Sequence, residues 1–176
     1  YKAKSKLVFD YLVSHQKEDG SWNYNKDLIT GIGKKQIDWH QGFIIDSLIN
    51  FVENNKNIDN KFHNCLTLAS NFYVKKQFSE KGQGYWRYPQ FWPIDIHNQA
   101  QGIITFSKLS KIDKSYLTNS KKIAIWSIKN MQDSRGHFYF QKWPFFINKI
   151  SYMRWSQAWM SLALSTLLVN IKDRYN

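Results

Sequence analysis

The feature of this sequence that most constrains its fold is an internal repeat. The hexapeptide IDWHQG at 37–42 returns as IDIHNQ at 94–99. The aspartates and the histidines of the two copies are both 57 positions apart (95 − 38 = 57): Asp38 with Asp95, and His40 with His97. A weaker third copy, MRWSQAW at 153–159, aligns Gln157 with Gln99 at an offset of 58 (157 − 99). A period of this length is typical of proteins built from repeated structural units.

Each copy follows an apolar stripe at i, i+3, i+4 and i+7 and then a glycine-aromatic turn, as in FDYLVSHQKEDGSWNY. The stripes predict helices at about 3–17, 59–78 and 117–132. Glycines are expected to end them as left-handed caps, namely Gly20, Gly82 or Gly84, and Gly136. A second apolar helix is predicted after each turn, at about 40–54, 97–110 and 153–172.

The repeated unit is therefore a helical hairpin with a long aromatic link. Three units are expected in one domain, at about 1–57, 58–114 and 115–176. Because each hairpin buries a face on its neighbour, a series of hairpins curves into an arc. The sequence predicts an all-α fold, a partial α/α-toroid of three hairpins. Strand signals are weak, so no regular sheet is expected beyond a short pairing of 137–140 with 143–147.

Charge and composition limit the partners. The net charge of +12 favours an acidic partner, but lysines occur as singles and pairs, so no nucleic-acid partner is expected. The most apolar stretch, Leu162–Ile171, is too short to span a membrane. The single cysteine, Cys65, is expected in the core and excludes a disulfide framework, which indicates a reducing, cytoplasmic location. The chain begins at Tyr1 inside a helix-like stretch, so a preceding segment is expected.

Several motifs resemble known toroid families. FDYLVSHQKEDGSW at 9–22 is similar to the QW-type repeats of terpene cyclases, and MRWSQAWMSLAL at 153–164 resembles a helix of unsaturated glucuronyl hydrolases, which are six-hairpin glycosidases. Nearly the whole chain resembles proteins of surface-polysaccharide biosynthesis loci, through DGSWNY, DWHQGFIIDSL, PIDIHNQAQGI, NMQDSRGHFYF and YMRWSQAWMSLAL. Some of those proteins are labelled delta-aminolevulinic acid dehydratase, but that activity belongs to a TIM barrel with alternating strands and helices. The resemblances imply a sugar or prenyl chemistry at the mouth of a ring.

The repeated Asp-x-His motif is the main candidate for chemistry. Asp38 and Asp95 each precede a predicted helix, with Gln41 or Asn98 three residues later, which is close to a capping box. Helix N-termini in a ring point toward one mouth, so two carboxylates and two imidazoles are expected in one cleft. Paired carboxylates perform acid and base catalysis on glycosidic bonds, and imidazoles titrate near neutral pH. The candidate catalytic residues are Asp38, Asp95, His40 and His97.

The same four side chains offer an alternative metal site, although positions i and i+2 of a helix face different ways, and neither metal nor cofactor is expected. The third copy has Met153 and Trp155 in place of Asp and His, and adds Arg154, a cation suited to binding a carboxylate or phosphate. Aromatic residues in the links suit sugar faces, or else pack over the mouth. The candidate substrate-binding residues are Trp22, Tyr24, Trp86, Arg87, Tyr88, Gln99, Tyr139, Arg154, Trp155 and Gln157. Aromatics at helical spacing are expected in the core: Phe9, Phe72, Trp126 and Trp159.

The sequence thus favours a carbohydrate-active or carbohydrate-binding protein of surface-polysaccharide biosynthesis or processing. Its cleft would be formed by the links 22–40, 84–99 and 138–157. An enzyme with this cleft would be of the hydrolase, lyase or epimerase type. The alternative is a non-catalytic helical-repeat module that binds a glycan or a protein through the same face. The expected partner is an oligosaccharide or polysaccharide, acidic ones included.

Overall fold

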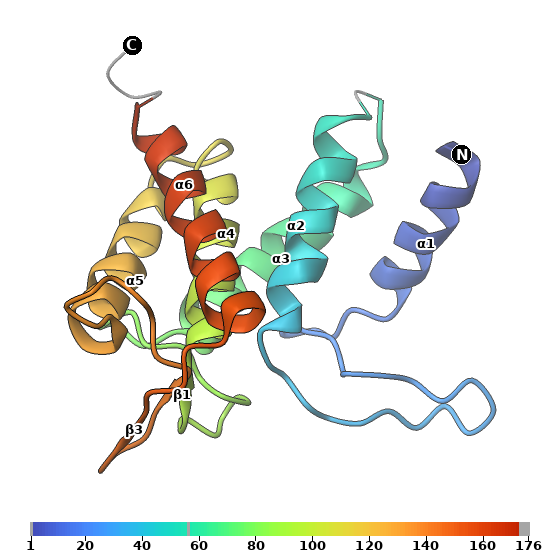
Figure 1. The fold of residues 1–176 in the computed structure, drawn as a ribbon. Helices are drawn as coiled ribbons and strands as arrows, with labels where there is room; N and C mark the ends of the chain where they lie inside the picture. The colour runs from blue at the N-terminus through green and yellow to red at the C-terminus, as the bar shows by residue number, and fades with distance from the viewer. Residues whose placement is uncertain (1, 56, 173–176) are drawn as a thin grey trace.

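The computed structural model describes residues 2–55 and 57–172, which contain six α-helices (Figure 1). They are α1 (Lys2–Ser14), α2 (His40–Glu53), α3 (Asn60–Phe72), α4 (Ile96–Leu109), α5 (Tyr116–Met131) and α6 (Ala158–Lys172). A π-helical segment, η1 (Tyr73–Gln77), extends α3, and a second, η2 (Met153–Gln157), precedes α6. All six helices predicted from the apolar stripes are present. The first ends at Ser14 rather than near residue 17.

The helices lie side by side and alternate in direction (Figure 1). The even-numbered helices start at the end of the molecule where the long links and strands lie, so the N-termini of α2, α4 and α6 share that end. Helix α4 packs against α2, α5 and α6, and α2 packs against α3. This arrangement brings the three copies of the repeated motif to one mouth, as the arc predicted from the sequence requires.

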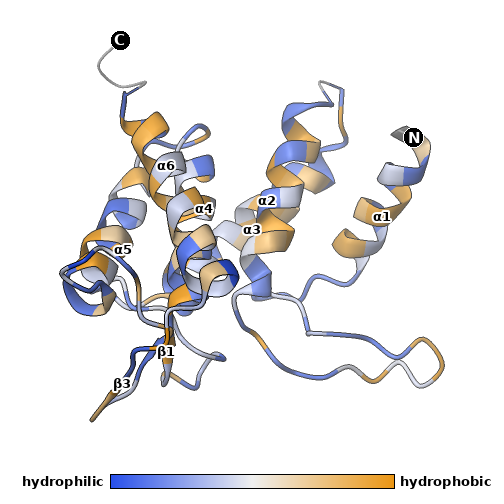
Figure 2. Ribbon diagram, in the orientation of Figure 1, coloured by the Kyte–Doolittle hydropathy of each residue, from blue (hydrophilic) through white to orange (hydrophobic). Residues whose placement is uncertain are grey.

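The core lies between the helices, where Figure 2 shows the hydrophobic segments facing one another. Its fully buried members come from every helix from α2 to α6, including Ile45, Leu48, Cys65, Ile103, Phe106, Ile123, Met131 and Met160. Phe72 is buried, and the other predicted core aromatics pack against this cluster: Phe9, Trp126 and Trp159. Cys65 is a free buried thiol, and burial raises its pKa to about 11.

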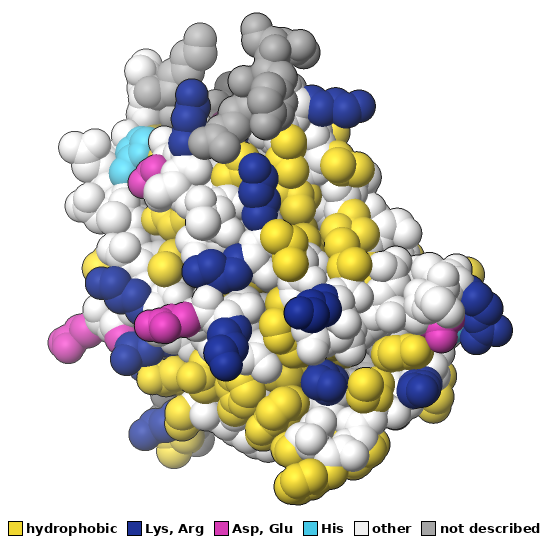
Figure 3. Space-filling model, turned by 90° about the vertical axis from the view of Figure 1, so that its left-hand side faces the viewer, with side chains coloured by type: hydrophobic (Ala, Val, Ile, Leu, Met, Phe, Trp, Pro, Cys, Tyr) yellow, Lys and Arg dark blue, Asp and Glu magenta, His cyan; other side chains and the backbone are white. Residues whose placement is uncertain are grey.

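The two ends of the arc expose apolar side chains. On α1 these are Leu7, Val8 and Tyr11, and on α5 and α6 they are Ile125, Ile128, Leu162, Leu168 and Val169. Figure 3, which faces the α5 side of the molecule, shows hydrophobic side chains gathered between scattered lysines and arginines. The end helices therefore present apolar faces that no other described helix covers.

A small antiparallel sheet corrects the strand prediction. Strand β2 (Gln141–Lys142) pairs with β3 (Ile147–Asn148) on one side and with β1 (Ile94–Asp95) on the other. The expected pairing of 137–140 with 143–147 is wrong, because the hairpin lies further along the chain, with Gln141 opposite Asn148. The strand β1 had no local signal, since its partner is far away in the sequence. This sheet places Asp95 opposite Gln141.

The glycine turns repeat in structure as well as in sequence. Gly20, Gly82 and Gly136 have positive φ and each donates a backbone hydrogen bond of 2.9 Å to the residue three positions earlier. They lie beyond the ends of α1, η1 and α5, so they form separate turns. The expectation that these glycines cap the helices directly is therefore wrong. Gly84, the alternative to Gly82 in the second copy, does not have a positive φ.

Glutamines from the even-numbered segments hold these turns. Gln41 accepts from the Trp22 backbone nitrogen at 3.0 Å and donates to its oxygen at 2.9 Å. Gln157 makes the same pair of bonds with Phe138, at 2.9 and 2.7 Å. In each case the held residue lies two positions after the turn glycine. Gln41 therefore does not complete a capping box, because its amide is committed to Trp22.

The second copy varies this pattern. Gln99 accepts from the Gly84 nitrogen at 2.7 Å and donates to the Gly82 oxygen at 2.9 Å. Asn98 donates to the Tyr85 oxygen at 2.7 Å, so it is not part of a capping box either. Three turns held by three glutamines support the proposed division into hairpins of about 57 residues.

Candidate active site

The two repeated aspartates stand at equivalent helix starts. Asp95 is the N-cap of α4 and accepts from the His97 backbone nitrogen at 2.8 Å. Asp38 accepts from the His40 backbone nitrogen at 3.1 Å, at the start of α2. The predicted N-cap is confirmed for Asp95, whereas the N-cap of α2 is Trp39, and Asp38 bonds the first helical N–H from one position earlier. Each carboxylate satisfies one of the free N–H groups of its helix and interacts favourably with the helix dipole.

Asp38 also orients the imidazole of His40. The two side chains meet at 2.6 Å, between Nδ1 of His40 and Oδ1 of Asp38, and the Gln36 amide donates to the other carboxylate oxygen at 2.5 Å. Asp38 is buried, whereas 42% of the His40 side chain is exposed. A buried carboxylate on Nδ1 fixes the orientation of the ring and leaves Nε2 free to act on a ligand.

Asp95 has different partners. Gln141 donates to its Oδ2 at 2.9 Å from strand β2, and the Trp155 indole nitrogen approaches its Oδ1 at 3.3 Å. Asp95 is fully buried, and burial raises the pKa of its carboxyl above the ordinary value, although these hydrogen bonds lower it in part. Asp95 thus joins α4, the sheet and η2 at the mouth.

His97 is the most unusual group at the mouth. It is 5% exposed, and both ring nitrogens are buried without a hydrogen-bond partner. Burial, with a smaller effect from the charge of His40, lowers its pKa to about 4. The ring is therefore neutral at pH 7. Buried polar atoms usually have partners, so two unpaired nitrogens on one ring mark a functional candidate.

Aromatic rings connect the two histidines. His97 contacts Trp155 and Trp159 at centroid distances of 4.4 and 4.5 Å. Trp39 lies 5.3 Å from His40 and 5.9 Å from His97, and Phe43 lies 5.5 and 5.9 Å from the same rings. We call this set the mouth cluster: Asp38, Trp39, His40, Phe43, Asp95, His97, Trp155 and Trp159. It combines two imidazoles with apolar walls, the usual composition of a ligand site.

Two cavities adjoin the mouth cluster. One, of about 500 Å³, is lined by Tyr152, Met153, Arg154, Trp155 and Trp159. The other, of about 330 Å³, is lined by Phe140, Tyr152 and Trp155. Both are lined by η2 and the chain before it, and α6 contributes Trp159 to the larger one. Segments of π-helix are often found at functional sites, because they re-aim side chains.

Several predicted binding residues lie at this mouth. Tyr24 stands edge-on to His40 at 5.4 Å, and Trp86 contacts Trp39 at 5.2 Å. The Arg87 guanidinium lies over the Trp86 ring at 5.4 Å. Arg154 and Trp155 line the larger cavity. Their role as substrate contacts stays a prediction.

Other predicted binding residues have structural roles. Trp22 is buried in the core, with its indole nitrogen bonded to the Leu12 oxygen at 2.8 Å. Gln99 and Gln157 hold the glycine turns through the oxygen and the nitrogen of their amides, and their role as sugar ligands stays a prediction. Tyr88 packs against Phe72 and Tyr85, and Tyr139 donates to Asp133 at 3.1 Å; neither has a ring contact with the mouth cluster.

Sequence reasoning missed part of the site. Trp39 and Phe43 were not singled out, although Trp39 lies between the Asp and His of the first motif. Gln36 and Gln141 hold the two carboxylates, and Gln141 had no local signal because the sheet brings it to Asp95. Trp159 was expected in the core alone, but its ring also contacts His97.

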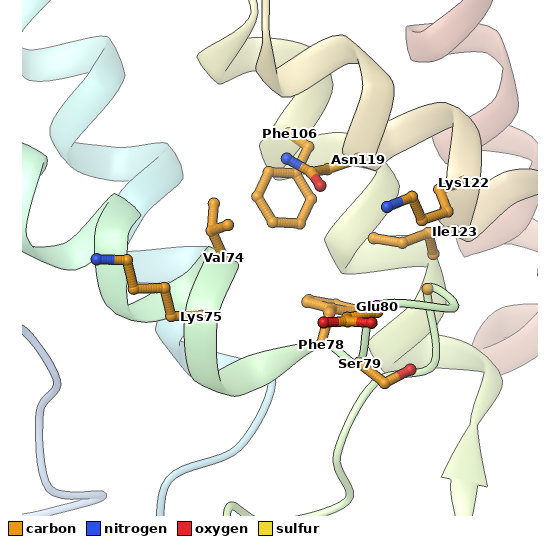
Figure 4. Close-up of a pocket in the computed structure, with 10 residues that line it drawn as sticks. Val74, Lys75, Phe78, Ser79, Glu80, Phe106, Asn119, Lys122 and Ile123 are labelled. Carbon is orange, nitrogen blue, oxygen red and sulfur yellow. The ribbon is translucent and has the colours of Figure 1, made fainter.

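A further cavity lies away from this mouth (Figure 4). It measures about 370 Å³, and its lining, which includes Val74, Phe78, Phe106 and Lys122, has no residue in common with the mouth cluster. In the described part of the chain, no three His, Cys, Asp or Glu side chains gather as metal ligands. Within that same part, every helix is too short or too polar to cross a membrane.

Comparison with known proteins gives structural matches alone. No family model and no curated protein matches the sequence. A cellobiose 2-epimerase from Bacillus thermoamylovorans aligns with 97% of this chain and 47% of its own, at 16% identity and a TM-score of 0.72. An unsaturated glucuronyl hydrolase specific for heparin aligns with 90% of this chain and 47% of its own, at 11% identity and a TM-score of 0.65.

A sugar epimerase from a ruminal bacterium aligns with 76% of this chain and 36% of its own, at 14% identity and a TM-score of 0.63. The chain therefore spans less than half the length of these three structures. Such low identities carry information about the fold and not about the reaction. With the six helices described above, the matches show that the chain has the fold of a partial α/α-toroid.

Proposed function

We propose that the mouth cluster is the site of a carbohydrate-processing enzyme that moves a proton next to the carbonyl group of a reducing sugar. One observation carries the proposal: His97 is a neutral, buried imidazole with two unpaired nitrogens, and it shares its aromatic walls with the oriented imidazole of His40. A neutral imidazole can accept a proton, and a carboxylate bonded to Nδ1 orients a second imidazole toward the same ligand.

The chemistry needs two positioned proton carriers. In an open-chain aldose, a base takes the proton from carbon 2, and the electrons of that bond delocalise onto the adjacent aldehyde oxygen as an enediolate. A proton returned to the opposite face of carbon 2 gives the 2-epimer. A proton returned to carbon 1, with transfer of the hydroxyl proton from oxygen 2 to oxygen 1, gives the ketose. The sugar is neither oxidised nor reduced overall. We assign the proton transfers to His97 and His40, with Asp38 orienting His40.

This assignment changes the sequence-based roles of the aspartates. Asp38 and Asp95 are buried and engaged at both oxygens by backbone, amide, imidazole or indole donors. Carboxylates that hydrolyse glycosides instead need room for the glycosidic oxygen and a water or sugar carbon between them. The geometry therefore favours imidazole chemistry over a carboxylate pair.

The structural matches support a carbohydrate substrate. Besides the two epimerases, a D-mannose isomerase aligns with 81% of this chain, at 16% identity and a TM-score of 0.56. Epimerisation at carbon 2 and aldose–ketose isomerisation begin with the same proton abstraction. A role in surface-polysaccharide biosynthesis or processing, in the cytoplasm, is part of the proposal and rests on the resemblance of the motifs.

The proposal is tested by product analysis. The protein is incubated with glucose, mannose or cellobiose, and the mixture is followed by NMR for the 2-epimer or the ketose. We expect a new sugar from the unmodified protein and from His63→Phe, an exposed histidine on α3, but not from His97→Phe. Conversion that persists in His97→Phe contradicts the assignment.

A second candidate function is a non-catalytic glycan-binding module. The burial of both His97 nitrogens favours it, because a sugar must first displace a neighbouring ring to reach them. Under this candidate, calorimetry detects glycan binding while NMR detects no conversion of any of the three sugars.

An acidic glycan is the proposed partner in either case. Arg154 is exposed at the larger cavity, and the net charge of the chain is +12. Calorimetric titration is expected to give tighter binding of an acidic oligosaccharide than of a neutral one, with a difference that shrinks as salt rises. Equal binding of both ligands contradicts this preference.

A further inference from the structure

Beside the mouth cluster, three aromatic rings form a cup: Phe140, Tyr152 and Trp155. Among the described residues, these three line the cavity of about 330 Å³. Phe140 and Tyr152 meet edge to face, with centroids 5.0 Å apart and planes at 82°. Phe140 immediately precedes β2, and Tyr152 immediately precedes η2, so the sheet and the π-helical segment together fix the cup. Phe140 is one of the link aromatics that the sequence offers for sugar faces, whereas Tyr152 was not a candidate binding residue.

Trp155 is a shared wall between the cup and the proposed reaction site. It lines the cup and also meets His97 at 4.4 Å with ring planes at 86°. Tyr152 and Trp155 line the larger cavity too, and that cavity reaches Trp159, which lies 4.5 Å from His97. The two cavities are therefore neighbours with two common walls, and one of them extends to the ring that flanks the histidine.

We propose that the cup binds the sugar ring linked to the ring that reacts, so that the ligand of this protein is a reducing disaccharide or a longer glycan. This inference rests on the proposed function. The C–H face of a pyranose packs on aromatic rings, and its hydroxyl groups remain at the edge, toward solvent and Arg154. The larger cavity leads the reducing end past Trp155 toward His97. A ligand with a single ring leaves the cup unfilled.

The test compares ligands of one and two rings. Cellobiose, maltose and lactose all end in a reducing glucose, so glucose is their common single-ring reference. Affinity is measured by calorimetry for the unmodified protein, Tyr152→Ala, Tyr152→Phe and Phe145→Ala. Tyr152→Ala removes one wall of the cup but keeps the backbone oxygen that accepts from Ser156 and Gln157. Phe145 is a matched control, because it lies between β2 and β3, is 98% exposed and does not line the cup.

We expect at least one disaccharide to bind about tenfold more tightly than glucose, an effect of the size that aromatic stacking provides. Tyr152→Ala is expected to bring the affinity for the disaccharide close to that for glucose, whereas Tyr152→Phe and Phe145→Ala keep the difference in affinity. Equal affinities for glucose and all three disaccharides, or a ratio unchanged in Tyr152→Ala, would overturn the cup as a subsite.

Product analysis on the same samples separates this outcome from failure of the proposed function. Conversion of glucose with no preference for a second ring contradicts the cup alone. A preference for a disaccharide that depends on Tyr152, without conversion of any sugar, supports the cup and contradicts the proposed reaction. Absence of binding by all four sugars overturns the subsite.

Discussion

Trp155 lies edge-on against His97, with the ring centroids 4.4 Å apart, and its indole nitrogen approaches Oδ1 of Asp95 at 3.3 Å. Trp155 is 37% exposed, whereas His97 is 5% exposed. The indole therefore separates the larger cavity from the buried His97 imidazole and Asp95 carboxylate. Its hydrogen bond to Asp95 is long and therefore weak, so moving the ring aside would cost little hydrogen-bond energy.

Replacing Trp155 by alanine is expected to open the site. Because burial is the main cause of the low pKa of His97, the pKa is predicted to rise from about 4 toward the ordinary value of 6.5. NMR titration of the His97 ring protons measures this change. Trp143→Ala is the control, since Trp143 stacks on Phe146 in the β-hairpin and has no ring contact with His97. A pKa that stays near 4 in Trp155→Ala contradicts the role of the indole as a cover.

The buried imidazole also predicts how stability depends on pH. The folded-state pKa of His97 is about 4 and the unfolded value is 6.5, so between these values the unfolded chain binds a proton that the folded chain does not. The contribution of His97 to the free energy of unfolding is therefore fully present above pH 6.5. It is lost as the pH drops toward 4, which lowers the free energy of unfolding by about 2–3 kcal/mol.

Urea unfolding at several pH values measures this loss, with His97→Phe as the comparison. The variant cannot titrate at this position, and its stability is expected to fall less across the same range. The carboxyl groups of Asp46 and Asp95, whose pKa values are raised by burial, titrate in both proteins and cancel in the difference. Parallel profiles for the two proteins argue against a neutral His97.

The glutamines that hold the turns are expected to matter for folding. Gln99→Ala leaves the Gly84 N–H and the Gly82 carbonyl without their buried partner, and is predicted to lower the free energy of unfolding by about 2–4 kcal/mol. Gln157→Ala is predicted to lower it by less, because Gln157 is partly exposed. Chemical denaturation measures both. A loss below about 0.5 kcal/mol for Gln99→Ala would falsify its structural role.

Asp38→Asn separates helix capping from catalysis. Asparagine caps a helix about as well as aspartate, so the melting temperature is expected to change little. It lacks the carboxylate that orients His40 through Nδ1, however, so turnover of the sugar is predicted to fall by about 100-fold or more. Asp38→Ala also removes the cap and is expected to lower stability by about 1 kcal/mol. Unchanged turnover in Asp38→Asn rules out the orienting role.

Local signals account for what the sequence predicts correctly. Apolar periodicity gives the six helices, and the repeated Asp-x-His places Asp38 and Asp95 at helix starts, because both features depend on residues within one or two turns. The repeat also indicates a shared mouth, since equivalent positions in a series of hairpins lie at the same end.

Long-range pairings explain what the sequence does not predict. Nothing near Gln99 in the sequence reveals that the partners of its amide are Gly82 and Gly84. Gln141 reaches Asp95 only through the sheet, and Trp155 reaches His97 only because α6 packs on α4. The same packing buries His97, one of the four candidate catalytic residues, at the centre of the candidate site.

The most direct test of the central claim is hydrogen exchange at carbon 2 of a reducing sugar. The protein is incubated with glucose, mannose or cellobiose in D₂O, and the loss of the carbon 2 proton signal is followed by NMR. The account predicts deuterium at carbon 2, with a rate at least about 100-fold lower in His97→Phe and in His40→Phe. Retention of the proton in all three sugars, or exchange that is unchanged in both variants, would contradict it.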